Sequence, residues 1–292
     1  MVFVQGRCER PLGTGDSGIT PEDQSLLRSL YGTPGSSSKV VPFIEAAGLA
    51  GKASEKFDVI SSMFTLHYFF QDRTMIDGFL QNIADNLKVG GFFVGCCFDG
   101  ETVFNKLSSL GFGGVLTGKE GDTEMWSVEK LYDSLPDELT LPDSDGGLGR
   151  KIKVNFITIG DGHEEYLVNF VYLRSRLAEM GIDMLTSEEM TTLGLKENSG
   201  MFKKLYDEMG GRFTMSPKLR EYSFLNRWFI YRRRSYGPLS AALVGEGGLP
   251  VPAPVEIVLP VLPSAGPTGA AGTRGRGRGR GGATRGTRGG KF

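Results

Sequence analysis

Apolar residues along the chain follow a strand pattern, then a helix pattern, then a strand pattern again. Residues 57–64, FDVISSMF, form a short apolar run of the length of a buried strand. Residues 72–87 follow, and their apolar side chains fall on one helical face: Ile76, Phe79, Leu80, Ile83 and Leu87. Residues 88–91, KVGG, predict a turn, and residues 92–98, FFVGCCF, predict a second strand. Because strand, helix, turn and strand in this order form the βαβ crossover of parallel sheets, we predict an α/β fold.

The other periodic segments add elements on both sides of this unit. Residues 2–5, VFVQ, predict a short strand, and residues 20–32 predict a helix with a cap signal at each end. Residues 150–160 alternate like a half-exposed strand, and residues 164–181 predict an amphipathic helix. Residues 223–234 predict a late strand. Late strands often give a mostly parallel sheet an antiparallel edge, and we expect that arrangement here.

Composition divides the chain into three parts. Residues 1–235 hold the periodic segments and form the predicted globular domain. Residues 236–267 are rich in proline, which favours extended conformations, and predict a linker. Residues 268–292 repeat arginine and glycine and predict a disordered tail, because this composition cannot bury a core. An alternative for this tail is a low-complexity end with no specific use.

Charge is distributed unevenly, although the net charge of the whole chain is only −1. After Glu256 there is no acid, and the seven cations there leave residues 1–256 with a net charge of −8. This asymmetry indicates a tail that contacts a polyanion such as RNA, and a domain that does not bind nucleic acid by bulk charge. The candidate RNA contacts are the tail arginines: Arg274, Arg276, Arg278, Arg280, Arg285 and Arg288.

The number and spacing of the cysteines, and the lengths of the apolar segments, indicate the cellular compartment of the protein. The chain has three cysteines, Cys8, Cys96 and Cys97, with neither a disulfide framework nor the CxxC spacing of a metal site. We therefore expect an intracellular, reducing compartment and no bound metal. The N-terminus lacks the long apolar region of a secretory signal, and no apolar run is long enough to span a membrane, so no membrane partner is expected.

An aromatic cluster, in residues 57–70, FDVISSMFTLHYFF, directly follows a predicted strand. Ligands of parallel sheets bind at the carboxyl ends of the strands, so Phe64, His67 and Tyr68 are candidates to stack on a planar base. The alternative is that these side chains are core at a strand end, which is the commoner role of aromatic residues. Motifs for nucleophilic, metal or acid-base catalysis are missing. A reaction that rests on proximity alone needs no catalytic residue; methyl transfer from a sulfonium donor to a ring nitrogen is one.

Two adjacent acids, Glu164 and Glu165, lie at the start of the helix predicted over residues 164–181. Carboxylates interact well with the dipole at a helix N-terminus, and this is the plain interpretation of the pair. A carboxylate that faces an aromatic slot also recognises the N1 and N2 donors of guanine. Both interpretations stay open at the level of these residues.

Four segments occur in one order along the chain: FDVISSMFTLHYFF, NIADNLKVGGFFVGCCFDGETVF, GDGHEEYLVNF and FLNRWFIYRRR. Together they resemble the mRNA cap guanine-N7 methyltransferases, particularly those of large DNA viruses, over about residues 1–234. The resemblance implies a class I (Rossmann-like) methyltransferase fold, partial at the N-terminus. It also implies that S-adenosylmethionine is the cofactor and that its methyl group moves to N7 of the cap guanosine of mRNA.

The resemblance assigns roles to individual residues and suggests partners. Phe64, His67 and Tyr68 match the family's FxxHY segment, which contacts the cap guanine, and Phe64 and His67 also lie beside the methyl donor. Glu165 matches the acid of the EYLV segment, which reads the guanine edge. The implied partners are capped mRNA, other capping-enzyme domains or a stimulatory subunit. The implied location is the nucleus or a cytoplasmic virus factory.

Departures from the family pattern concentrate on the donor side. The family's first donor-binding motif, of the form LDLGCGxGGD, does not occur in this sequence. Arg7 stands where the family has an aspartate, Asn226 where cellular members have a tyrosine, and the family's proline near Phe98 is replaced. Two explanations fit: a fragment of a longer enzyme, or a non-catalytic relative that binds RNA or the cap. A methyltransferase for another small nucleophile would keep the fold without needing Glu165 beside His67 and Tyr68.

Overall fold

The computed structural model describes residues 1–33, 39–135, 138–160, 162–210 and 214–234. These residues belong to one compact unit, Met1–Gly245. The predicted linker, residues 236–267, and the predicted arginine-rich tail, residues 268–292, lie outside the described residues. Within the described ranges, no helix combines the length and the apolar character needed to cross a membrane.

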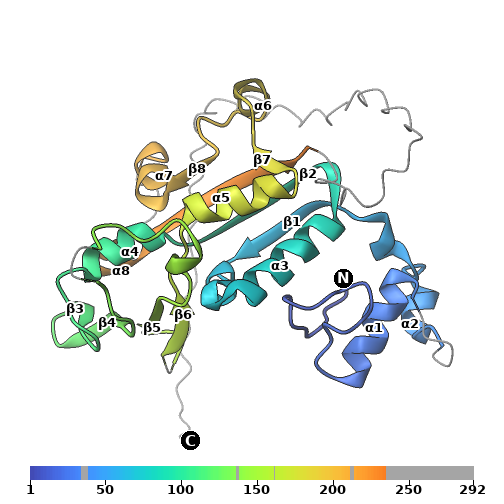
Figure 1. Cartoon of the computed structure of the whole chain (residues 1–292), viewed down its shortest axis with the longest axis horizontal. Helices are drawn as coiled ribbons and strands as arrows, with labels where there is room; N and C mark the ends of the chain where they lie inside the picture. Colours follow the sequence, from blue (N-terminus) through green and yellow to red (C-terminus); the bar gives the residue numbers. More distant parts are fainter. Residues whose placement is uncertain (34–38, 136–137, 161, 211–213, 235–292) are drawn as a thin grey trace, which may run out of the picture. The chain divides into compact units, whose positions relative to one another are not determined.

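A mixed sheet of five strands forms the centre of the unit (Figure 1). Its order is β1 (Phe57–Met63), β2 (Leu87–Phe98), β9 (Asn226–Arg233) and β7 (Ile182–Met184), and β8 (Ser199–Met201) also pairs with β9. β1 and β2 are parallel and are joined by helix α3 (Arg73–Asn86), which confirms the predicted βαβ unit. The predicted late strand, β9, is antiparallel to β2.

The expectation of a mostly parallel sheet is wrong for the described residues. β9 pairs antiparallel with β2, with β7 and with β8, so β1 and β2 supply the parallel pairing that the structure describes. The reason is that β9 lies directly beside β2 and runs antiparallel to it. The two remaining strands, β7 and β8, pair with β9 and are antiparallel to it. The α/β class itself is confirmed.

A second sheet of four antiparallel strands lies beside the first: β3 (Val115–Glu120), β4 (Thr123–Lys130), β5 (Lys151–Phe156) and β6 (His163–Tyr166). The acids Glu164 and Glu165 therefore lie in a strand, and the expectation that they open a helix is wrong. That helix, α5 (Phe170–Glu179), begins later because the Asn169 side chain caps it, accepting hydrogen bonds from the N–H groups of Val171 and Tyr172.

The remaining helices are short and lie around the two sheets. They are α1 (Pro21–Tyr31), α2 (Pro42–Ala46), α4 (Gly100–Leu107), α6 (Ser187–Thr192), α7 (Phe202–Glu208) and α8 (Pro217–Ser223), with the 3-10 turns η1 (Lys52–Glu55), η2 (Leu66–Gln71) and η3 (Asp145–Gly147). The predicted signals of α1 are confirmed, since Thr20 and Asp23 form a capping box and Gly32 ends the helix in the left-handed conformation. The strand predicted at residues 2–5 is absent, and the bridge Gly6–Gly18 lies nearby.

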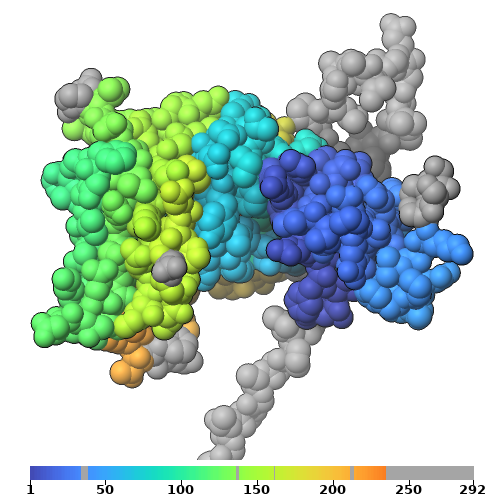
Figure 2. Space-filling view, turned by 90° about the horizontal axis from the view of Figure 1, so that it is seen from below, coloured from blue at the N-terminus to red at the C-terminus, as the bar shows by residue number. Residues whose placement is uncertain are grey.

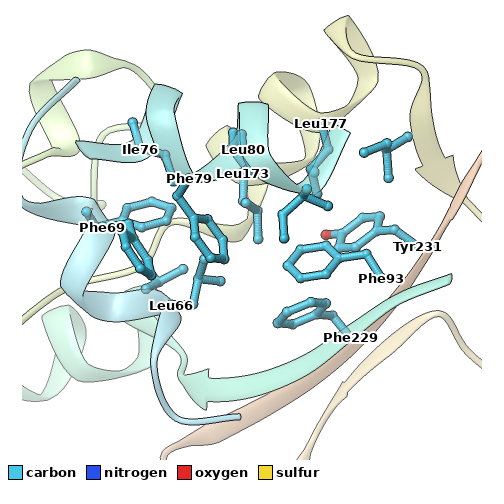
Figure 3. Close-up of a cluster of buried hydrophobic side chains, with 14 of the residues drawn as sticks. Leu66, Phe69, Ile76, Phe79, Leu80, Phe93, Leu173, Leu177, Phe229 and Tyr231 are labelled. Carbon is cyan, nitrogen blue, oxygen red and sulfur yellow. The ribbon is translucent and has the colours of Figure 1, made fainter. Parts of the chain in front are cut away.

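The main hydrophobic core lies between helices α3 and α5 and one face of the mixed sheet (Figure 3). Phe93, Phe229 and Tyr231 point from strands β2 and β9 toward the helices. On the helix side, Leu80, Leu173 and Leu177 are fully or almost fully buried. A second core joins α4 to β4 and β5 around Phe104 and Val128. These two cores hold the carboxyl ends of β1 and β2 in place beside the second sheet.

Strand β1 is much more exposed than its apolar sequence predicts. Phe57, Val59 and Met63 are 43%, 54% and 50% exposed, so the expectation that Phe57 to Ser62 pack as a buried strand is wrong. The exposed side chains alternate along the strand and so lie on one face, whereas Ile60, on the other face, packs against the core. The turn predicted at residues 88–91 is wrong as well. These residues belong to β2, where the register against β1 shifts and Gly90 adopts a positive φ of 84°.

The N-terminal segment is held against α3 by one buried amide side chain. Asn82 accepts a hydrogen bond from the Leu12 N–H (3.1 Å) and donates to the carbonyl oxygens of Cys8 (2.7 Å) and Arg10 (2.6 Å). The approach is close, because a side chain at Gly78 of α3 would come within 2.0 Å of the Glu9 carbonyl oxygen. Figure 2 shows this N-terminal segment, in dark blue, gathered beside the cyan residues that follow it.

Replacing Asn82 by alanine should detach the N-terminal segment from α3. The substitution leaves three backbone groups without their partner, which costs about 2 kcal/mol of stability. Amide hydrogen exchange at residues 8–12 should rise well before that of the α3 core. Gln81→Ala is the matched control, since Gln81 contacts the exposed Asp85 on the same helix. Unchanged exchange at residues 8–12 in Asn82→Ala would contradict this assignment.

Candidate functional site

Phe64 is the first residue beyond the carboxyl end of β1. Its N–H donates a hydrogen bond to the Cys96 carbonyl oxygen (2.7 Å), and its backbone is left-handed, with φ of 54°. The side chain is 52% exposed and meets the Phe202 ring edge-on, with 6.4 Å between ring centroids. The ring of Phe64 therefore stands at the strand end rather than in the core, as the base-contact interpretation predicts.

His67 lies in the turn η2 that follows, and it is only 5% exposed. Its ring packs edge-on against Tyr68, with 4.3 Å between centroids and 71° between planes. Neither ring nitrogen has a hydrogen-bond partner among the described residues. Burial lowers the pKa of His67 to about 4, so the imidazole is neutral at pH 7. A neutral buried ring without partners is suited to contact a bound molecule.

Glu165 of strand β6 points toward this ring. Its Oε2 lies 3.5 Å from Nδ1 of His67, and its side chain is 14% exposed. No hydrogen bond to this carboxyl group comes from any residue that the structure describes. Burial raises the pKa of Glu165 to about 7. The pKa of Tyr68 is also raised, first by burial and then by the nearby charge of Glu165.

The structure brings together His67, Tyr68 and Glu165, which lie about 100 residues apart in sequence. Phe64 stands at the same strand end but contacts Phe202 of α7, a residue that the sequence analysis missed. Tyr222 was missed as well: burial raises its pKa, with a further contribution from the charge of Glu165. No local sequence pattern identifies Phe202 or Tyr222 as site residues, because only the tertiary fold brings helices α7 and α8 close to Phe64 and Glu165.

Asn226 begins strand β9 and is 4% exposed. Its Nδ2 donates to the carbonyl oxygens of Tyr222 (3.4 Å) and Ser223 (3.1 Å), while Oδ1 has no partner among the described residues. The amide thus holds the end of α8 to the start of β9. The predicted RNA contacts, Arg274 to Arg288, lie outside the described residues.

A groove of about 540 Å³ runs along β1 between the N-terminal segment and α3. The residues that line it include Glu9, Ser62, Thr65, Tyr68 and Phe69. The volume lies in the usual range for small-molecule sites, and a mixture of aromatic, hydroxyl and acidic residues suits a nucleoside. These residues fit one wall of a site for an adenosine-containing donor, next to the His67 and Tyr68 pair.

A comparison with known protein families identifies the domain. The sequence model of the mRNA (guanine-N(7))-methyltransferase domain matches residues 45–223, more than half of the chain. The chain belongs to this family. The family match and the α/β architecture together confirm the class I methyltransferase fold that the resemblance of the four sequence segments implied.

Individual relatives in this family are more distant. A probable mRNA-capping enzyme of Acanthamoeba polyphaga mimivirus is 26% identical over 62% of this chain and 17% of its own length. The mRNA cap guanine-N(7) methyltransferases of Aspergillus fumigatus and Saccharomyces cerevisiae are 29% and 27% identical, over 31% and 56% of this chain and 13% and 34% of their own lengths. The chain thus spans about a third or less of the length of these curated relatives. The structure of the CcbJ methyltransferase from Streptomyces caelestis aligns with a TM-score of 0.34 at 14% identity, over 61% of each chain.

Proposed function

We propose that the chain transfers a methyl group from S-adenosylmethionine to N7 of the 5′ cap guanosine of mRNA. The observation that carries this proposal is the buried Glu165 carboxyl group, which has no protein donor among the described residues and faces the His67 and Tyr68 rings. Guanine presents two N–H donors on one edge, at N1 and N2, and a carboxylate accepts both. Incorporation of tritiated methyl into RNA that ends in a guanosine cap, but not into uncapped triphosphate RNA, tests the proposal.

Position and charge, rather than proton transfer, account for the reaction. S-adenosylmethionine, when bound, supplies a methyl group on a positively charged sulfur. N7 of guanine has a free lone pair, so no base is needed, and the bond to the methyl carbon forms as the carbon–sulfur bond breaks. The positive charge then passes to the purine ring. The Glu165 carboxylate lies where it can stabilise that charge, because it already binds the edge of the same ring.

The neutral His67 ring and Tyr68 hold the purine plane in place. His67 is buried and packed edge-on against Tyr68, so its orientation is fixed before a ligand arrives. Ser62, Thr65 and Glu9 line the adjoining groove and would contact the sugar and base of the donor. The two reactants then meet at the carboxyl end of β1, beside Phe64.

A non-catalytic cap-binding subunit is the second candidate. It is favoured by one observation: the sequence lacks the family's glycine-rich donor motif. Titration calorimetry separates the two candidates, with S-adenosylmethionine in one experiment and the cap dinucleotide GpppG in the other. Binding of both ligands supports the enzyme, and binding of GpppG alone supports the subunit.

The arginine-rich residues 268–292 are proposed to bind the body of the RNA. Arginine and glycine repeats contact phosphates and stack on bases with little sequence preference. The acidic remainder of the chain, with a net charge of −8 over residues 1–256, would otherwise repel a long RNA. An intracellular, reducing compartment, either the nucleus or a cytoplasmic virus factory, and further capping domains or a stimulatory subunit belong to the same proposal.

Deleting residues 268–292 should weaken binding of long capped RNA by about ten-fold or more at low salt, and leave binding of GpppG unchanged. The reason is that the dinucleotide lacks the RNA body that the tail is proposed to bind. Fluorescence anisotropy at two salt concentrations measures both affinities. A variant with the six tail arginines replaced by lysine is the control, since it keeps the charge and loses guanidinium stacking. Equal weakening for both ligands would contradict a role for the tail in RNA binding.

A further inference from the structure

The two halves of the candidate site belong to different sheets (Figure 1). His67 and Tyr68 lie in η2, which follows β1 of the mixed sheet, whereas Glu165 lies in β6, at the edge of the second sheet. Among the described residues no hydrogen bond joins η2 to β6, and Oε2 of Glu165 only approaches Nδ1 of His67, at 3.5 Å. The separation of these two side chains therefore depends on contacts with other parts of the chain.

Residues 145–149, in the connection between β4 and β5, lie directly against η2. The Gly149 N–H donates a hydrogen bond to the Phe70 carbonyl oxygen of η2 (2.9 Å). Gly149 has a positive φ of 75°, which glycine adopts without strain, so its N–H can point at this carbonyl group. Leu148 packs against the main hydrophobic core, which also contains Phe70. The 145–149 segment thus holds the turn that carries His67.

The same stretch of chain continues into the strand beside Glu165. The Leu167 N–H donates a hydrogen bond to the Arg150 carbonyl oxygen (3.0 Å), and Ile152 of β5 is the register partner of Glu165 in β6. Ile152 is buried in the second core. Because Ile152 follows soon after Gly149 in the sequence, a short hydrogen-bonded path connects η2 to β6.

Asp145 joins the start of this segment to both helices that cover the mixed sheet. Its carboxylate accepts hydrogen bonds from the Tyr172 hydroxyl of α5 (2.7 Å) and from the Arg73 guanidinium of α3 (2.9 Å). The pKa of Asp145 is lowered, first by the hydrogen bond from Tyr172 and then by the one from Arg73. The ring of Tyr172 also meets Phe70 edge-on, with 6.2 Å between ring centroids. Tyr172 therefore contacts both the segment and the turn that the segment holds.

We propose that the 145–149 segment positions η2 against β6 and so sets the separation of His67 and Glu165 at which the guanine ring binds. The inference rests on the proposed function, since it assigns the segment a role in the same site. Asp145 and Leu148 act through His67 and Glu165, so they are positioning residues. When the segment is loosened, water enters between the two side chains, and the carboxylate no longer meets the purine edge at the required distance.

Leu148→Ala and Leu110→Ala form a matched pair of variants of the full chain. Both leucines are half-buried, but Leu148 packs against the core that contains Phe70, whereas Leu110 packs against the second core. The two truncations remove the same side chain and should lower the unfolding temperature by similar amounts. Only Leu148→Ala should weaken GpppG binding, by about ten-fold, as measured by titration calorimetry.

The decisive readout is the titration of Glu165 in the chain without ligand, followed by carbon NMR of the labelled carboxyl group. In Leu148→Ala the pKa of Glu165 should fall from about 7 toward its ordinary value of 4.5, because water reaches the carboxyl group. In Leu110→Ala it should stay at the parent value. A loss of stability alone, without repositioning of η2, would not separate the two variants.

Tyr172→Phe is the second variant, and it serves if Leu148→Ala does not fold. It removes the hydroxyl that binds Asp145 and keeps the ring against Phe70, so it should lower the pKa of Glu165 and weaken GpppG binding by about three-fold. An unchanged pKa of Glu165 in Leu148→Ala and Tyr172→Phe, or an equal change in Leu110→Ala, would overturn the proposal. If GpppG does not bind to the parent chain, the proposed function fails, while the titration of Glu165 still tests the positioning.

Discussion

Replacing Glu165 by alanine is expected to reduce methyl transfer to capped RNA by about 100- to 1,000-fold. The substitution removes the acceptor for both guanine N–H donors and the charge that opposes the positive purine product. A loss of this size corresponds to about 3 to 4 kcal/mol of transition-state stabilisation. Tritiated methyl transfer to capped RNA measures the rate. Calorimetry with GpppG measures how much of the loss is already present in binding of the cap.

Glu164→Ala is the control for this experiment. Glu164 is the preceding residue of strand β6, its side chain is 57% exposed, and it pairs with Lys151 at the surface. It has the same chemistry as Glu165 but points away from the His67 ring. Methylation by Glu164→Ala should therefore equal that of the parent chain. If Glu165→Ala retained full activity on capped RNA, the guanine-edge role of this carboxylate would be refuted.

Glu165→Gln is expected to make the chain more stable at pH 8, by up to about 3 kcal/mol. In the folded state burial raises the pKa of Glu165 from 4.5 to about 7, and this difference corresponds to about 3 kcal/mol. Because the folded pKa is the higher one, the contribution of Glu165 to stability is complete below about pH 4.5. It is lost as the pH rises through 7, when the buried group must ionise. Glutamine stays neutral and avoids this loss.

Affinity for the cap should change in the opposite direction over the same pH window. The carboxylate form accepts the guanine donors, so the affinity for GpppG should fall as the pH drops below about 7, by up to ten-fold per pH unit. Thermal unfolding and GpppG titrations at pH 5.5, 7 and 8.5 measure both trends. In Glu165→Gln, stability and GpppG affinity should both depend less on pH, whereas Glu164→Gln should keep the pH dependence of the parent chain. A variant Glu165→Gln that is less stable than the parent at pH 8 would contradict the assigned cost of burial.

The sequence predicted those parts of the fold that depend on local periodicity. The βαβ unit from Phe57 to Phe98 follows from its apolar pattern, and the start of α1 follows from Thr20. The number of neighbours of a strand is not a local property, so the exposure of Val59 could not be predicted. Glu165 was misplaced for a related reason: a strand of four residues is too short to show its alternation.

Most of the candidate site residues lie close together, although the element predicted for Glu165 was wrong. Phe64, His67, Tyr68 and Glu165 were selected as aromatic rings and an acid that could bind a base, and three of these now lie together. Their chemistry is visible in the sequence because residue type and the strand-end position determine it. Phe202 reaches the site through the pairing of β8 with β9, a contact that no local pattern indicates. The roles of these residues stay predictions until the variants are measured.

The left-handed backbone of Phe64 affects how the site is prepared for a ligand. An aromatic residue in this conformation stores conformational strain of about 1 to 3 kcal/mol, which the hydrogen bond to Cys96 and the rest of the fold must offset. This free-energy cost is part of the free energy of folding, because the strained conformation forms before any ligand is present. The main chain thus sets the direction of the Cα–Cβ bond of Phe64 before any ligand binds. A ligand that meets this ring loses less affinity to the ordering of the protein.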